Sequence, residues 1–227
     1  MRIAVVQHRI RTHERMDLAA MLAMSEHASD EGAQVIVYPH VPGIVPGSQL
    51  LDAFFRNVGE RCPGMQLVRP RMRHRAGEEM ACSPTALGRT IVLADDDCID
   101  PALFPLVQAL GCETLVWMFV AEGDLQAEAI LELALDASLT LAPLVIVASV
   151  TGHARDVDAH GLSAIVHLGE LVAEGGGGED LLIADLAVPA AMTQHVRRLP
   201  EPTPVLLQRL AAHRGTTAPL DHPADLS

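Results

Sequence analysis

The sequence predicts an α/β domain in which strands pack against helices. The first forty residues give one reason, because an apolar run at 3–7, a helical stripe within 17–31 and a β-branched run at 34–38 form a strand-helix-strand unit. Residues 88–149 alternate strand and helix patterns in the same way. With 227 residues, 49% of them hydrophobic, the chain can bury one sizeable core. We therefore expect a single domain over residues 1–215 and a loosely ordered tail over 216–227.

The elements follow from periodicity and from stop signals. Leu18, Met21, Leu22 and Ala28 share one helical stripe, and Gly32 is a natural stop after it. Strands are expected at 3–7, 34–38, 91–94, 114–120, 144–149, 164–168, 171–173 and 181–186, and helices at 17–31, 50–58, 100–111, 125–141 and 205–212.

Three local signals refine this assignment. Asp100 followed by Pro101 predicts a helix that starts there, with an aspartate N-cap and a proline in the first turn, and Gly111 predicts its end. Gly169 predicts a hairpin between two short strands. The glycine run 175–178 is typical of a flexible tip.

Charge, cysteine content and hydropathy exclude several classes of protein. The net charge of −13 predicts an acidic surface that repels nucleic-acid backbones, so no nucleic-acid partner is expected. The four cysteines show no paired spacing typical of a disulfide scaffold or a zinc site. Apolar stretches are shorter than the roughly 18 residues of a membrane span, and the N-terminal run is too short for a signal peptide. We expect a cytoplasmic protein without a cofactor and without a membrane partner.

All 16 basic residues are arginines, so no reaction step that needs a lysine amine is open to this chain. The stretch 69–75 is a basic run in an acidic protein, and two readings of it stay open. It is either a solvated loop or a site for a substrate anion.

Three segments, taken in order and spacing, resemble the nitrilase (carbon–nitrogen hydrolase) superfamily. The first is the strand that ends at Gln7, followed by Gly32-Ala33 and a strand that ends at Pro39; the second runs without gaps over 88–117. The third is the Gly-x-Ser-x-Ile-Val pattern at 161–166 with the Gly-x-Leu hairpin and the strand after it. This resemblance spans most of the chain outside 41–87 and the tail. It implies a four-layer αββα sandwich that pairs into a dimer.

The family's chemistry uses a glutamate base, a lysine and a cysteine nucleophile, and none of the three is found at the matching positions. His40 follows Pro39 where the family has glutamate. Asp95, seven residues after Gly88, takes the place of the cysteine at the nucleophile elbow. Met72 takes the place of the lysine, and a shift of one residue offers Arg71 or Arg73 instead. Asp97 and Trp117 are expected to line the pocket, because they belong to the segment that resembles the family around the nucleophile.

These replacements leave three hypotheses open. The resemblance first implies a pseudoenzyme, that is, a non-catalytic partner subunit or a small-molecule binder that works as a homodimer or in a hetero-oligomer. The second is a repurposed enzyme in which His40 and Asp95 act on a small polar substrate as a general base. In a variant of it, a metal ion is ligated by His40 with Asp95, Asp96 or Asp97, and His8 is a further candidate ligand. The third is an ordinary carbon–nitrogen hydrolase with Cys98 as its nucleophile.

Overall fold

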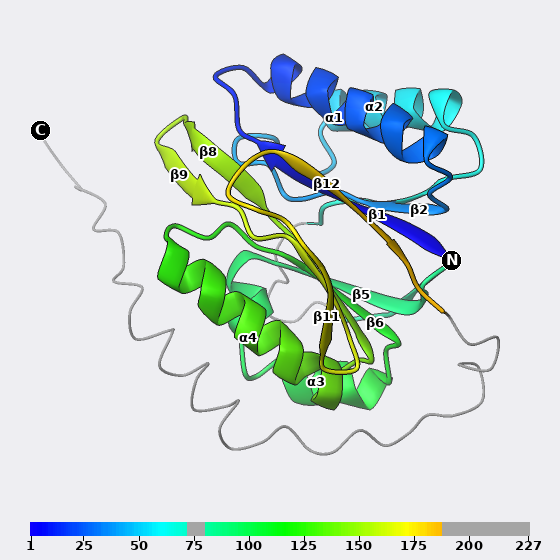
Figure 1. Cartoon of the computed structure of the whole chain (residues 1–227), viewed down its shortest axis with the longest axis vertical. Coiled ribbons are helices and arrows are strands. Elements are labelled where there is room, and N and C mark those ends of the chain that lie inside the picture. The colour runs from blue at the N-terminus through cyan, green and yellow to red at the C-terminus, as the bar shows by residue number, and fades with distance from the viewer. Residues whose placement is uncertain (72–79, 188–227) are drawn as a thin grey trace, which may run out of the picture.

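The computed structural model describes residues 1–71 and 80–187 and arranges them in four layers. Two β-sheets lie face to face (Figure 1). Helices α1 (Glu14–Asp30) and α2 (Gln49–Arg61) cover the outside of the first sheet. Helices α3 (Phe104–Leu110) and α4 (Asp124–Thr140) cover the outside of the second. The predicted α/β class and the αββα sandwich are confirmed.

Strand β1 is the centre of the first sheet. Within the described chain this sheet has six strands in the order β3-β2-β1-β8-β9, with β12 also paired to β1. β1 runs parallel to β2 and β8 and antiparallel to β12. The strands are β1 (Arg2–Arg9), β2 (Val35–Val37), β3 (Gln66–Val68), β8 (Val150–Ala154), β9 (Val157–His160) and β12 (Asp180–Asp185).

The second sheet is built around three parallel strands. Its order is β11-β10-β7-β6-β5-β4, again counted over the described residues, and β5, β6 and β7 run parallel to one another. The strands are β4 (Ser83–Thr85), β5 (Gly88–Ala94), β6 (Thr114–Met118), β7 (Leu144–Ala148), β10 (Ala164–His167) and β11 (Glu170–Glu174). Between β5 and α3 lies a short 3-10 turn, η1 (Asp95–Ile99).

The layers are held together by three apolar clusters, which follow from the alternation of side chains along each strand. Along β1, Ala4 and Val6 face α1 and α2, whereas Ile3 and Val5 face the second sheet. Along β6, Val116 belongs to the cluster between the sheets, and its neighbours on the strand belong to the cluster under α3 and α4. The apolar period of two therefore places each sheet between a helical layer and the other sheet.

Most predicted elements are present, but the helix expected from Asp100 begins later. α3 starts at Phe104, and Leu103 is its N-cap. The Asp100 Oδ1 atom instead accepts a hydrogen bond from the backbone N–H of Ala102 at 2.9 Å, which forms a separate turn. An aspartate before a proline favours such a turn as well as a helix cap, so the predicted start was wrong. Gly111 ends the helix as expected, with φ 58.

Two further differences concern segments whose sequences lack the apolar periodicity of a strand or a helix. The strands β3, β4, β8 and β9 are present but are not predicted by the sequence pattern. The glycine run expected to be a flexible tip is fastened to the sheet, because Gln7 Nε2 donates to the carbonyl oxygens of Gly176 and Gly178. Thr151 donates to the carbonyl of Gly177 at 2.7 Å.

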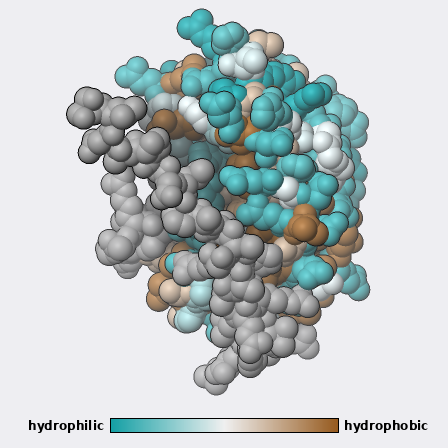
Figure 2. Space-filling view, turned by 90° about the vertical axis from the view of Figure 1, so that its left-hand side faces the viewer, coloured by the Kyte–Doolittle hydropathy of each residue, from teal (hydrophilic) through white to brown (hydrophobic). Residues whose placement is uncertain are grey.

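The face of the molecule in Figure 2 is mainly hydrophilic, with hydrophobic residues in small separate patches. Within residues 1–71 and 80–187, no helix has the length and apolar content needed to cross a membrane. The helix predicted at 205–212 and the tail predicted at 216–227 lie outside the described residues.

Candidate functional site

His40 is placed by the end of β2 and by a tight turn after it. The chain leaves β2 through Tyr38 and Pro39, and Val41–Ile44 then forms a β-turn in which the N–H of Ile44 donates to the carbonyl of Val41 at 3.0 Å. Pro42 occupies the second position of this turn and Gly43, with φ 87, the third. These are the residues that a type II turn prefers at those positions, so the sequence itself fixes the loop next to His40.

Asp95 is placed by the end of β5, where the strand turns into η1. Its φ is 51, in the left-handed region that costs energy for any residue with a Cβ atom. Aspartate tolerates this region better than most residues, and strained residues of this kind also cluster at functional sites. The strand-to-helix turn therefore projects the Asp95 side chain away from the sheet at the elbow that the sequence predicts.

The two side chains meet although they are 55 positions apart. The His40 Nδ1 atom lies 3.4 Å from Asp95 Oδ1, at the long end of hydrogen-bond range. The His40 side chain is 23% exposed and that of Asp95 33%, so both members of the pair are partly exposed to solvent. The structure thus brings together the positions predicted for the glutamate and the cysteine, as an imidazole and a carboxylate, between the C-terminal ends of strands from the two sheets.

Cys98 does not meet the requirements for a nucleophile. It is fully buried in the apolar cluster under α3 and α4, and its Sγ lies 4.0 Å from the carbonyl oxygen of Met118. Burial raises the pKa of the Cys98 thiol well above its usual value, and the charges of Asp95 and Asp97 raise it further. A thiolate is the reactive form, so the hypothesis of Cys98 as the nucleophile lacks both access and ionisation.

The predicted pocket residues occupy different surroundings. Trp117 is 1% exposed and packs in the same apolar cluster as Cys98, and its role as a pocket residue stays a prediction. Its side chain follows the alternation of β6 toward α3 and α4. Asp97 is buried at 7% exposure inside η1, two residues from Asp95.

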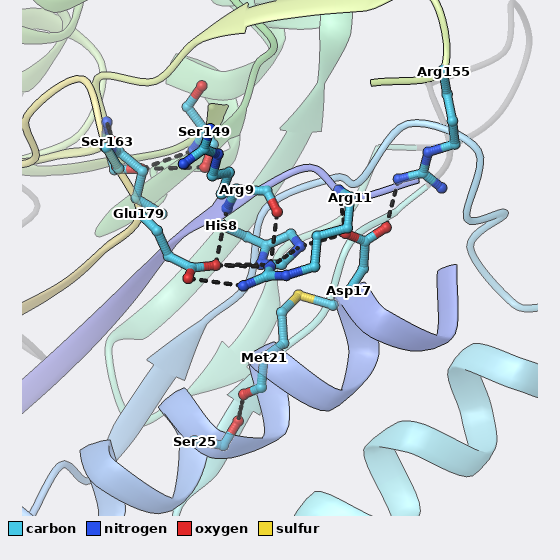
Figure 3. Close-up of polar contacts among 12 residues, drawn as sticks. His8, Arg9, Arg11, Asp17, Met21, Ser25, Ser149, Arg155, Ser163 and Glu179 are labelled. Carbon is cyan, nitrogen blue, oxygen red and sulfur yellow. Dashed lines mark hydrogen bonds and ion pairs between the residues drawn. The ribbon is translucent and has the colours of Figure 1, made fainter. Parts of the chain in front are cut away.

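A buried charged cluster is the feature that sequence analysis did not find (Figure 3). His8 and Asp17 are both fully buried, with His8 Nε2 2.7 Å from Asp17 Oδ1. On the other side of the ring, His8 Nδ1 lies 3.2 Å from Glu179 Oε1. Arg11 contacts both oxygens of Glu179 at 2.9 Å. Arg155 reaches Asp17 Oδ2 at 2.5 Å.

Both carboxylates of this cluster are held in their charged form. Burial alone would raise the pKa of Asp17, but the hydrogen bonds from His8 and from the Arg11 N–H, with the charges of His8 and Arg155, lower it below its usual value. In Glu179 burial is likewise outweighed, by hydrogen bonds from Arg11 and from the Arg9 N–H, so its pKa is also lowered. His8 is therefore fully engaged by carboxylates, and its suggested part in a metal site is not supported.

Neither a protein-family model nor a curated protein matches this sequence. Solved structures do match. A mutant of the amidase from Nesterenkonia sp. AN1, with the acetamide moiety of fluoroacetamide added at its active-site cysteine, gives a TM-score of 0.66 at 19% identity over 95% of this chain and 96% of that one. A cysteine-to-serine mutant of the same amidase, described as from the nitrilase superfamily, gives 0.64 at 18% identity over 82% of this chain and 91% of that one. This chain has the nitrilase-superfamily fold.

In this nitrilase fold, the stretch predicted to replace the lysine is not part of the described structure. Met72 and Arg73 both lie outside the described residues. Just before them, Arg71 is exposed and the guanidinium of Arg69 stacks over the ring of Phe55 at 4.8 Å. Within residues 1–71 and 80–187, no group of three or more histidine, cysteine or acidic side chains is arranged to hold a metal ion. The metal-assisted hypothesis therefore has no support from the described part of the site.

Proposed function

We propose that this protein is a pseudoenzyme of the nitrilase fold that binds a small polar molecule at the His40–Asp95 pair. The observation that carries the proposal is the contact itself, 3.4 Å between His40 Nδ1 and Asp95 Oδ1 at the predicted nucleophile elbow. The pair is partly exposed and offers both a donor or acceptor imidazole and an acceptor carboxylate. Such a pair suits a ligand that carries hydroxyl, amine or amide donors.

The absence of carbon–nitrogen hydrolase activity is supported by the groups that this chemistry needs. A thiolate must attack the amide or nitrile carbon, and a cation must stabilise the oxyanion, often the largest single contribution to the rate. At the elbow the chain has a carboxylate, Asp95, and the nearest thiol in sequence, Cys98, is sealed in the core. Lysine is absent from the entire sequence.

The binding proposal is tested with a library of small amides, amino alcohols and carboxylic acids, screened by thermal shift and confirmed by calorimetry. A genuine ligand of this site binds the wild-type chain and loses about tenfold or more in affinity in His40→Ala and in Asp95→Asn, since each removes a hydrogen-bonding group from the pair. Arg61→Ala is the matched control, because it breaks an exposed ion pair between Arg61 on α2 and Glu26 on α1, away from the elbow. Ligands whose affinity is unchanged in both site variants contradict the proposal.

The role of a non-catalytic partner subunit is part of the same proposal. The resemblance implies pairing into a dimer, so the chain would assemble with a second copy of itself or with a different chain. Light scattering after size-exclusion chromatography measures the mass in solution directly. A mass close to twice 24.2 kDa is expected for the homodimer, and a monomer at micromolar concentration would leave only the hetero-oligomer reading.

A second candidate function is general-base catalysis by the same pair, and the contact between imidazole and carboxylate favours it. A carboxylate that orients an imidazole gives a base able to abstract a proton in an isomerisation, a hydration or an enolisation. In that case His40→Ala reduces the rate by about 10²- to 10⁴-fold. A rate that is independent of His40 would exclude this function.

A further inference from the structure

We infer that Arg155 is a positioning residue that holds the loop of His40 in place against Asp95. The inference rests on the proposed function in one respect, because it takes the His40–Asp95 pair as the binding site. Arg155 lies far from His40 in sequence, at the tip of the hairpin between β8 and β9. Its guanidinium points from the hairpin tip toward the buried Asp17 (Figure 3).

The hairpin tip is built so that Arg155 points inward. Arg155 and Asp156 link β8 to β9, and both have positive φ values, 55 and 60. A two-residue hairpin turn of type I′ requires positive φ at both positions and strongly prefers asparagine, aspartate or glycine there. Arginine at the first position is therefore strained. The strain is offset by the charge-assisted contact of Arg155 Nη2 with the fully buried Asp17 Oδ2 at 2.5 Å.

The same guanidinium lies against the turn that follows His40. A Cβ atom added to Gly43 would lie 3.1 Å from Arg155 Nη1, which is closer than nearly all real contacts of that kind. Glycine at this position thus serves the type II turn and also lets the guanidinium approach the backbone. Arg155 Nε and Nη1 are buried and have no hydrogen-bond partner among the described residues, so the guanidinium is held where two of its three nitrogens lack a partner.

The buried cluster of His8 and Asp17 holds Arg155 at the end of the first sheet where the His40 loop begins. The register between β1 and β2 pairs Ile3 with Val35 and Val5 with Val37. Extended along the chain, this register brings His8 to the level of His40. Asp17, held by His8 and by Arg155, therefore lies at the end of the sheet from which the His40 loop departs. The chain of contacts runs from the core of β1 through Asp17 and Arg155 to Gly43.

The test measures His40 directly and needs no ligand. Diethyl pyrocarbonate modifies neutral, accessible imidazoles, and mass spectrometry gives the rate at each histidine. In Arg155→Ala the rate at His40 is expected to rise by about threefold or more, because the loop loses its support and the contact with Asp95 loosens. The rates at the exposed His13 and His27, both outside the hairpin, serve as internal references, and Arg61→Ala is the matched arginine control.

Two further variants separate positioning from general stability. Arg155→Lys keeps a charge near Asp17 but not the planar group against Gly43, so the melting temperature is expected to recover while the His40 rate stays raised. Gly43→Ala is expected to raise the modification rate of His40 by a larger factor in the wild-type chain than in a chain that already carries Arg155→Ala. The reason is that the added Cβ atom clashes with the Arg155 guanidinium, which the second chain lacks. If Arg155→Ala lowers stability and leaves the His40 rate unchanged, or if the two substitutions act independently, the inference is overturned. Failure of the ligand screen would leave this result standing, so the two proposals fail separately.

Discussion

At the scale of single residues, the environment of each side chain decides what it can do, and Cys98 is the clearest case. Cys98 lies three residues after Asp95, so the sequence alone makes it a candidate nucleophile. In the fold, η1 directs it into the apolar cluster under α3 and α4, where its ionisation is suppressed. The reactivity expected of Cys98 from its residue type is therefore higher than its buried environment allows.

Cys98 is predicted to react slowly with iodoacetamide in the native state. Cys82 is the internal comparison, since it is partly exposed, and its pKa is also raised by burial. We expect Cys82 to be alkylated first and Cys98 only when the chain unfolds. Peptide mass spectrometry over a time course gives both rates. Preferential labelling of Cys98 in the folded protein would revive the thiol mechanism.

Asp17 is predicted to be the most sensitive charge in the described structure. It is fully buried, and it joins His8, Arg155 and the N–H of Arg11. Asp17→Asn removes the charge and leaves the guanidinium of Arg155 without its counter-ion, which typically costs about 3–5 kcal/mol for a buried pair. Urea unfolding gives the difference. Asp158→Asn, at an exposed ion pair of the same hairpin, is the control, and a similar loss in both variants would contradict the prediction.

How far these contacts can be predicted depends on separation along the chain and on local spacing. His40 and Asp95 were found because each stands at a fixed count from a recognisable Pro or Gly. The cluster around His8 was not predicted. Glu179 and Arg155 lie more than a hundred residues further along the chain, and no fixed sequence spacing links them to His8. A buried histidine beside a strand end gives no signal of its partners in one sequence.

At the scale of elements, apolar periodicity locates the long helices and the buried strands, whereas short strands and polar caps escape it. β8 and β9 carry a hairpin with an arginine and an aspartate in its turn, and this pair does not read as a turn signal of type I′. The start of α3 was misplaced because Asp100 forms its own turn. Local preference is ambiguous at these points, and tertiary contacts settle it.

The glycine segment before β12 is predicted to depend on Gln7 for its order. Gln7 donates to the carbonyls of Gly176 and Gly178 and accepts from the N–H of Ser163 at 2.6 Å. Gln7→Leu roughly preserves the side-chain volume and removes all three hydrogen bonds. Each buried polar group that loses its partner lowers the free energy of unfolding by about 1–3 kcal/mol. Hydrogen exchange at residues 175–179 should accelerate, while exchange in α4 stays unchanged. Equal protection in the variant would mean that the backbone alone holds the segment.

At the scale of the whole molecule, the buried cluster gives stability a definite dependence on pH. The pKa values of Asp17 and Glu179 are lowered in the folded state, so the ionised carboxylates stabilise it. This contribution is complete above the values of the unfolded chain, near 4, and is lost as the pH falls below them. We predict that the free energy of unfolding drops from about pH 4 downward, and that Asp17→Asn flattens this slope. An equally steep slope in the variant would place the acid sensitivity elsewhere.

The fold as a whole was predictable because its signals are distributed: strands and helices alternate, and each sheet is apolar on both faces. The function was less predictable than the fold. Solved structures that share 17–20% identity with this chain establish its fold but not its chemistry. Only the residues at the elbow bear on that question. There an imidazole lies beside a carboxylate, and the proposal that thiol chemistry has been lost rests on that pair.

The central claim is that this nitrilase fold has lost carbon–nitrogen hydrolysis, and ammonia release tests it most directly. The full-length protein is incubated at micromolar concentration with a panel of small aliphatic and aromatic amides and nitriles, beside His40→Ala, Asp95→Asn and Cys98→Ser. The account predicts that the wild-type chain releases no more ammonia than the three variants do. Release by the wild-type chain that disappears in Cys98→Ser or in His40→Ala would contradict it.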